Sequence, residues 1–201
     1  MLKKVFGGGL VLFAVLGFGA LYLLSSGASE GSAAFARGGV ETVAELKEVR
    51  QYRKWTRVHT TPLPLSTTLD GLCRAPTQVN LIETSSNPHR QNYFSVYVNE
   101  AGSQAMLSQS KPVFPPGSII VKEKLPAKDS TRALMLTVMI KHDKGFNPAT
   151  GDWEYAVTNG EGSEIEWRGT RANCHACHAL KNETDYVFRS YLSDEAKQKL
   201  H

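Results

Sequence analysis

The hydrophobic and polar positions along the chain predict an ordered series of strands framed by helices. Residues 43–55 carry apolar side chains at three- and four-residue spacing, and Thr42 can cap the helix that this spacing predicts. Residues 93–98, Tyr-Phe-Ser-Val-Tyr-Val, have the aromatic and β-branched content of a strand. By the same criteria, further strands are expected at residues 118–125, 133–141, 153–158 and 164–168.

Turn residues separate these segments and indicate how they connect. Phe114-Pro115-Pro116-Gly117, Asn147-Pro148 and Asn159-Gly160 are turn signals. The remaining expected segments are helices at residues 100–110, 185–192 and 194–200 and an irregular stretch, rich in Pro, Thr, Ser and Asn, at residues 59–90. Strands joined by short turns imply an antiparallel sheet. The predicted fold class is therefore α+β, mainly antiparallel β-sheet with flanking N- and C-terminal helices.

The N-terminus has the composition of an export signal or a membrane anchor. Lys3 and Lys4 precede the twenty uncharged residues 5–24, and small and polar residues follow. The apolar run just reaches the length needed to cross a bilayer, which favours an anchor, while Ser-Gly-Ala and the Ala-Phe-Ala ending at Ala36 offer cleavage sites. We expect residues 1–24 to be the signal peptide or anchor, residues 25–41 a flexible linker, and residues 42–201 one domain outside the cytoplasm.

Composition narrows the class of function. After a signal is removed, roughly 165 residues remain, enough for one domain with a core. The formal net charge of +4 is spread along the chain, without a basic stripe or a phosphate-binding loop. These features argue against nucleic acid and nucleotides as partners.

The strongest chemical signal is the pentad Cys174-His175-Ala176-Cys177-His178. In a C-x-x-C-H motif two thiols can add to the vinyl groups of one haem, and the following histidine can bind its iron. The alternatives are a redox dithiol and half of a zinc site. The third cysteine of the chain, Cys73, lies far away, and no βαβ pattern surrounds the motif. One covalently bound haem c with His178 as iron ligand is therefore the expected cofactor.

Other residues are weaker candidates. Met106, Met135 and Met139 are each candidates for a sixth iron ligand, but methionines at strand or helix spacing are usually core residues. Asp185, seven residues after His178, could accept the second imidazole N–H or cap a helix.

For the remaining histidines and the third cysteine we expect structural roles or none. We expect His175 to lie on the surface, and Cys73 to be buried or to form an intermolecular disulfide. No function is assigned to the histidines in polar loops or at a strand end, which are His59, His89 and His142.

Several motifs together resemble the cytochrome P-460 family. They are Val96-Tyr97-Val98-Asn99, Phe114-Pro115-Pro116-Gly117 with the following Ser-Ile-Ile-Val-Lys-Glu, Gly151-Asp152-Trp153-Glu154-Tyr155, and the pentad followed by Thr184-Asp185-Tyr186-Val187-Phe188. The resemblance covers about residues 43–192. It implies a small, exported, mostly β protein, often a dimer, with one haem c held by a single axial histidine. Better-known members oxidise hydroxylamine or bind nitric oxide.

The resemblance also implies roles for single residues. Cys174, Cys177 and His178 match the thioether and axial positions, and Lys122 matches the lysine that cross-links to the haem edge in hydroxylamine-oxidising members. Those members place an arginine and a carboxylate in the pocket, where this chain has Phe94 and Thr137 by position. The loss of a carboxylate removes a proton acceptor and makes the pocket more like that of the gas-binding relatives.

Three functions remain open at this point. The protein is a haem c oxidoreductase acting on small nitrogen compounds with a periplasmic redox partner, a non-catalytic gas-binding or sensing protein, or an electron carrier. No methionine or histidine follows the pentad as in small electron carriers, which argues against the third. On a strand, Ile120, Lys122 and Lys124 share one face and Val121 and Glu123 the other, so we expect Lys122 to face the haem edge.

Overall fold

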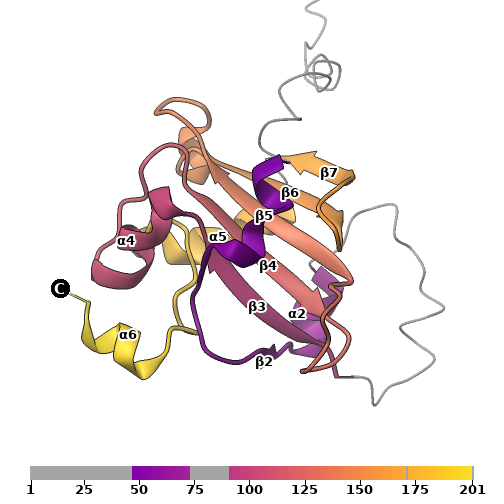
Figure 1. Cartoon of the computed structure of the whole chain (residues 1–201). Coiled ribbons are helices and arrows are strands. Elements are labelled where there is room, and N and C mark those ends of the chain that lie inside the picture. Colours follow the sequence, from indigo (N-terminus) through magenta and orange to yellow (C-terminus); the bar gives the residue numbers. More distant parts are fainter. Residues whose placement is uncertain (1–46, 73–90, 171, 201) are drawn as a thin grey trace, which may run out of the picture. The chain divides into compact units, whose positions relative to one another are not determined.

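The computed structural model describes residues 47–72, 91–170 and 172–200 (Figure 1). The predicted signal peptide or anchor, the linker, Cys73 and His89 lie outside the described residues. Among the helices of the described part, none is long and apolar enough to span a membrane.

Within the described residues, seven strands form one antiparallel sheet. Their order is β1-β3-β4-β5-β6-β7, and β2 also pairs with β3. The strands are β1 (Thr56–Arg57), β2 (Leu63–Pro64), β3 (Tyr93–Val98), β4 (Ile119–Leu125), β5 (Met135–Lys141), β6 (Trp153–Asn159) and β7 (Ile165–Gly169). The predicted strands are thus present within two residues of the expected bounds, and the α+β, mainly antiparallel class is confirmed.

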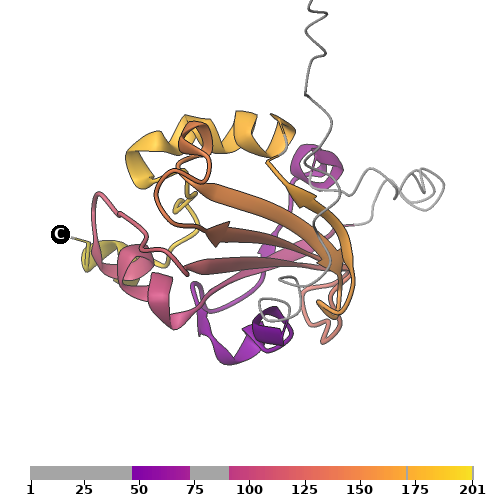
Figure 2. The same cartoon turned by 90° about the horizontal axis from the view of Figure 1, so that it is seen from above.

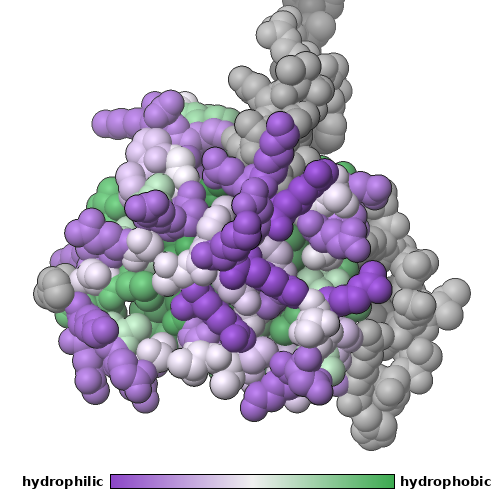
Figure 3. Space-filling model, viewed as in Figure 1, coloured by the Kyte–Doolittle hydropathy of each residue, from purple (hydrophilic) through white to green (hydrophobic). Residues whose placement is uncertain are grey.

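Helical segments cover both faces of the sheet. They are η2 (Tyr52–Lys54), α2 (Thr67–Leu72), α4 (Glu100–Ser108), η3 (Pro148–Thr150), α5 (Ala172–His178), η4 (Ala179–Thr184) and α6 (Asp194–Gln198). Seen from above, α5 and η4 lie over one face and η2 lies over the other (Figure 2). We call these the α5 face and the η2 face. Figure 3 shows that hydrophilic side chains run across the centre of the view that has η2 in front.

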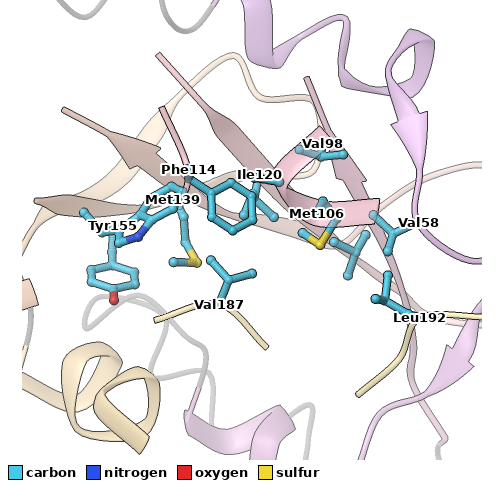
Figure 4. Packing of buried hydrophobic residues seen from close by; sticks show 12 residues of the cluster. Val58, Val98, Met106, Phe114, Ile120, Met139, Tyr155, Val187 and Leu192 are labelled. Atoms are coloured by element: carbon cyan, nitrogen blue, oxygen red, sulfur yellow. The ribbon is translucent and has the colours of Figure 1, made fainter. Parts of the chain in front are cut away.

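Strict alternation along the strands supplies each face with its own core. On the α5 face, Trp153, Ile120 and Val98 pack with Phe114 and Met106 in one cluster (Figure 4). On the η2 face, a second cluster contains Val49, Tyr52, Tyr97, Ile119, Val121, Leu136, Val138, Ile140 and Ala156. Because both faces are covered, a polar side chain on a central strand costs free energy unless it is hydrogen-bonded or paired.

Three expectations about helices require correction. The first helix does not continue to residue 55, since residues 47–49 are its last helical residues and a 3₁₀ turn follows after residues 50–51. The stretch 59–90 is not wholly irregular, because it contains β2 and α2. Residues 185–192 are not helical: Asp185 and Tyr186 have φ values of 53° and 65°, in the left-handed region, which interrupts a right-handed helix.

Candidate functional site

The pentad occupies α5, directly after β7. In a helix, positions three and four apart share one face, so Cys174, Cys177 and His178 project to the same side. Neither cysteine of the pentad forms a disulfide bond, and both are half-buried. Cys174 packs against the core cluster of the α5 face. The helix therefore directs two thiols and one imidazole toward the sheet.

The His178 imidazole is held by a backbone carbonyl and two aromatic rings. Its Nδ1 lies 2.7 Å from the carbonyl oxygen of Tyr186. A carbonyl only accepts hydrogen bonds, so Nδ1 carries the hydrogen and Nε2 keeps its lone pair. The ring centroids of Tyr155 and Phe188 lie 5.2 and 5.1 Å from that of His178. This is the hydrogen-bond pattern of a metal-binding histidine.

Burial keeps the His178 imidazole neutral. It lowers the pKa of His178 to about 4, and the positive charge of Lys122 contributes to the same shift, against the opposing effect of the hydrogen bond to Tyr186. The contribution of Lys122 means that this side chain, on β4, is close enough to His178 to act on its charge. At neutral pH the Nε2 lone pair is therefore available to a metal.

One row of residues runs across the sheet beside His178. Direct cross-strand neighbours form it: Val96, Lys122, Thr137, Val157 and Trp167. The next row contains Tyr155, the ring that contacts His178. Lys122, Thr137 and Trp167 are half-exposed, although they lie on a covered face of the sheet. These three side chains of the row are thus partly accessible, one row from the ring that contacts the imidazole.

Phe94 lies beside Lys122 and other aromatic rings. The Lys122 ammonium is 5.9 Å from the Phe94 ring centroid. Phe94 also makes edge contacts with His59 and Tyr191, at 5.8 and 6.1 Å between centroids. The predicted residues Phe94, Lys122 and Thr137 are therefore brought to one face, as the alternation of β3, β4 and β5 predicts.

His59 is a part of this region that sequence reasoning missed. It is 6% exposed, where a loop position without a role had been expected. Its Nδ1 lies 2.6 Å from the Thr61 carbonyl oxygen, and the Val96 N–H donates to its Nε2. Burial lowers the pKa of His59, so it is a neutral side chain behind Phe94. The buried position of His59 follows from its hydrogen bond to β3, and no local sequence motif predicts it.

The carboxylate nearest in sequence to Lys122 lies on the other side of the sheet. Glu123 is 3% exposed on the η2 face, where the hydroxyls of Tyr52 and Tyr97 and the guanidinium of Arg53 donate to it. The row of five residues that includes Lys122 contains no carboxylate. Thr137, the residue expected in place of an acidic one, is the direct neighbour of Lys122 in this row.

Asp185 has one of the two roles considered for it. It does not accept from the imidazole, which bonds to the Tyr186 carbonyl, but it is the C-cap residue of η4, and its N–H donates to the Asn182 carbonyl at 3.1 Å. Its carboxylate instead accepts from Lys141 Nζ, at 2.7 and 2.8 Å, and from the Phe114 N–H at 2.8 Å. Asp185 is thus linked to His178 only through the backbone of the next residue.

The remaining candidates pack in the core or contact neighbouring side chains. Met106, Met135 and Met139 are at most 8% exposed and pack in the two clusters of the α5 face. His175 is half-buried, rather than on the surface as expected, with its ring centroid 6.0 Å from that of Tyr186. His142 stacks on Phe146 with centroids 4.0 Å apart and bonds to Glu154 on the η2 face.

Comparison with known families decides the identity of the fold. The profile of the Cytochrome P460 family matches residues 49–189, which include the sheet, the pentad and the loop that holds His178. This chain belongs to the cytochrome P460 family. No match was found among curated proteins. Membership of the P460 family makes the chain a haem-binding cytochrome.

The residues present fit the haem that the P460 family binds. A neutral imidazole with a free Nε2 and two thiols on one helix face form the donor set. The Tyr155 hydroxyl is buried and has no hydrogen-bond partner among the described residues, and its ring points away from β6 (Figure 4). A buried polar atom without a partner indicates a missing neighbour. A haem between α5 and the sheet would border Tyr155, Lys122, Thr137 and Phe94. The described residues contain no group of three or more His, Cys, Asp and Glu side chains that could hold a metal ion directly.

Proposed function

We propose that this P460 protein is an exported cytochrome that oxidises hydroxylamine at a single covalently bound haem c. The observation that carries the proposal is the half-exposed Lys122 in the row beside His178. A lysine there is placed to reach the edge of a group ligated by His178, as the likeness to the hydroxylamine-oxidising members implies.

Covalent attachment follows from the chemistry of the two thiols. Each S–H adds across one vinyl group, so a C–S bond and a C–H bond replace the S–H bond and the vinyl double bond without an oxidant. Cys174 and Cys177 are three positions apart on α5, and neither forms a disulfide bond. His178 follows directly and supplies the axial nitrogen.

The side opposite His178 is proposed to remain open for substrate. The methionines considered as sixth ligands are all buried in core packing. When bound, the haem supplies an iron that can bind a small nitrogen compound and take up its electrons. Thr137 can hydrogen-bond the substrate, the Lys122 side chain limits its position, and Phe94 keeps water from that side of the pocket.

A bond from Lys122 Nζ to a carbon of the haem edge would complete the enzyme. Forming this bond replaces one N–H and one C–H and releases two electrons and two protons, which a two-electron oxidant such as peroxide must take up. The place of Lys122 on β4, on the face of the sheet that α5 covers, supports this bond.

Nitric oxide binding without catalysis is the second candidate. It is supported by the absence of a carboxylate from the row that contains Lys122 and Thr137, since oxidation of hydroxylamine releases protons that need an acceptor. The aromatic group of Phe94, His59 and Tyr191, next to Lys122, also suits an apolar gas. An electron carrier with a closed sixth position has the least support.

Two measurements on the purified protein distinguish these functions. A strongly red-shifted Soret band of the ferrous protein, together with a tryptic peptide in which haem joins the pentad to Lys122, is expected for the enzyme. An unmodified Lys122 peptide, with the spectrum unchanged in Lys122→Leu, would leave nitric oxide binding as the function. Lys128→Leu, at an exposed position after β4, is the matched control and should change neither measurement.

Export and partners belong to the same proposal. Covalent haem attachment takes place outside the cytoplasm, and the charge and length of residues 1–24 suit a signal peptide or an anchor that holds the domain at the membrane. A periplasmic redox partner would then receive the electrons. A homodimer is the assembly that the family likeness suggests, and gel filtration with light scattering would test it.

A further inference from the structure

We propose that the ion pair between Lys141 and Asp185 is a positioning device for the axial ligand, acting through the carbonyl of Tyr186 on His178. The inference rests on the proposed role of His178 as iron ligand. It assigns to Lys141 and Asp185 a control over the strength of the iron–imidazole bond, although neither residue touches the imidazole.

The Asp185 carboxylate is held at three points. Lys141 Nζ lies 2.7 and 2.8 Å from its two oxygens, and the Phe114 N–H donates to it at 2.8 Å. Lys141 Nζ also donates to the Gly151 carbonyl at 2.8 Å. The side chains of Lys141 and Asp185 are only 11% and 13% exposed, so their attraction is weakly screened. The ion pair therefore ties the loop after η4 to the end of β5.

The backbone of this loop has a conformation that needs such support. Asp185 and Tyr186 follow one another with φ values of 53° and 65°, which is unfavourable for residues with a Cβ atom. The Trp153 indole N–H donates to the Asp185 carbonyl at 2.8 Å, and the Tyr186 N–H donates to the Lys181 carbonyl at 2.7 Å. Two left-handed residues turn the Tyr186 carbonyl toward the imidazole of His178.

Gly151 makes room for this arrangement. A Cβ atom at Gly151 would come within 2.4 Å of two ring carbons of Tyr186. The ring of Tyr186 thus packs directly on the backbone whose carbonyl accepts from Lys141. We call the ion pair of Lys141 and Asp185 the clamp. It contacts the loop through the Asp185 carboxylate, and the Tyr186 ring of the same loop packs on Gly151, whose carbonyl accepts from Lys141.

The Tyr186 carbonyl is the acceptor for Nδ1 of His178, and its position depends on the loop that the ion pair of Lys141 and Asp185 holds. A fixed acceptor at 2.7 Å raises the basicity of the imidazole and strengthens its bond to iron. Loss of the clamp lets the carbonyl move, which weakens the hydrogen bond and the electron donation to iron.

The test uses the full haem-loaded protein with resonance Raman spectroscopy and redox titration. Asp185→Asn and Lys141→Met should each shift the ferrous iron–histidine stretching band to lower frequency and raise the reduction potential. Lys141→Arg, which keeps the cation, should lie between these variants and the parent protein. Bands and potentials equal to those of the parent protein in both Asp185→Asn and Lys141→Met would overturn the proposal.

Glu154→Gln is the matched control. It removes a carboxylate whose side chain is 10% exposed, close to the value for Asp185, and which is paired with Arg168. Glu154 lies on β6, the strand next to β5, but on the η2 face. Glu154→Gln should lower the melting temperature but leave both the stretching band and the potential unchanged. An equal shift in Glu154→Gln would mean that the effect is general destabilisation, and would overturn the proposal.

Failure of the clamp and failure of the proposed function are separable. Shifts in the clamp variants, with no hydroxylamine oxidation by the parent protein, would support the clamp and refute the enzyme. An iron–histidine band that persists unchanged in His178→Gly would show that His178 is not the ligand, and would overturn both.

Discussion

Lys122 on β4 and Thr137 on β5 are direct cross-strand neighbours on the α5 face. The adjacent pair, Glu123 and Leu136, is buried on the η2 face. Successive side chains on a strand point to opposite faces, so a slip of one residue in β4 would exchange a lysine for a carboxylate beside His178. The register of two strands thus decides whether an acid or a base lies on the face of the sheet near His178.

A carboxylate can be restored opposite Lys122 by Thr137→Glu. We expect this variant to raise the rate of hydroxylamine-dependent reduction of an electron acceptor by about tenfold or more, because a positioned acid–base group typically contributes ~10²–10⁴-fold. Thr137→Gln introduces a side chain with nearly the shape of glutamate but without its charge, and should not raise the rate. If both variants behave alike, proton transfer does not limit the reaction and this prediction fails.

Replacement of the pentad cysteines should remove the thioether bonds one at a time. Cys174→Ala and Cys177→Ala should each keep haem on the polypeptide after acid-acetone extraction, with the pyridine haemochrome α band moved to longer wavelength. The double variant should lose all covalent haem. Complete extraction of haem from the parent protein would contradict covalent attachment.

Met139 lies next to Tyr155 in the cross-strand rows and is the methionine to test as an iron ligand. Met139→Leu should cost less than about 1.5 kcal/mol of unfolding free energy, because the two side chains have similar volume. The near-infrared magnetic circular dichroism should not change, since the side chain belongs to the core cluster of the α5 face. Loss of a methionine-to-iron band in this variant would mean that the sixth position is closed.

The pH dependence of stability should depend in part on Glu154. Burial alone would raise the pKa of Glu154, but hydrogen bonds from Arg168, at 2.8 Å, and His142, at 2.7 Å, outweigh it and lower the pKa below the usual 4.5. A carboxylate with a lowered folded-state pKa stabilises the protein fully above the unfolded-state pKa, and this contribution is lost as the pH falls through the folded-state value.

Urea unfolding of the parent protein and of Glu154→Gln between pH 7 and pH 3 measures this contribution. We expect the variant to be less stable by about 2–3 kcal/mol at pH 7, the usual loss when a charged partner is removed from a half-buried network. The difference should begin to shrink below about pH 4.5, where the carboxylate of the unfolded chain becomes protonated, and should be lost as the pH falls through the lower folded-state pKa. A difference that stays constant across this range would refute the assignment.

Much of the fold could be predicted from local patterns. The strands are defined by alternation over five to seven residues, and the expected bounds of β3, β4, β5, β6 and β7 agree with the structure within two residues. Alternation depends only on neighbours in the chain, so it can be recognised without the fold. The same holds for the pentad, whose chemistry lies in the spacing of five consecutive residues.

Local patterns failed where distant groups control the backbone. Residues 185–192 have helix-compatible side chains, yet Asp185 and Tyr186 adopt the left-handed region because Lys141, Trp153 and Phe114 hold them from other segments. No glycine or asparagine at these two positions signals the turn. The energy that selects this conformation comes from contacts far apart in sequence.

The sequence by itself determined the α+β class, the strand positions, the spacing of the C-x-x-C-H pentad and the faces of β4, because these follow from spacing along the chain. Only the tertiary structure decided that the Lys122 charge acts on His178, that the Tyr186 carbonyl holds the imidazole, and that Asp185 binds Lys141. These relationships depend on register and on the packing of α5 against the sheet. They come from the balance of many long-range contacts, which no local period of the sequence encodes.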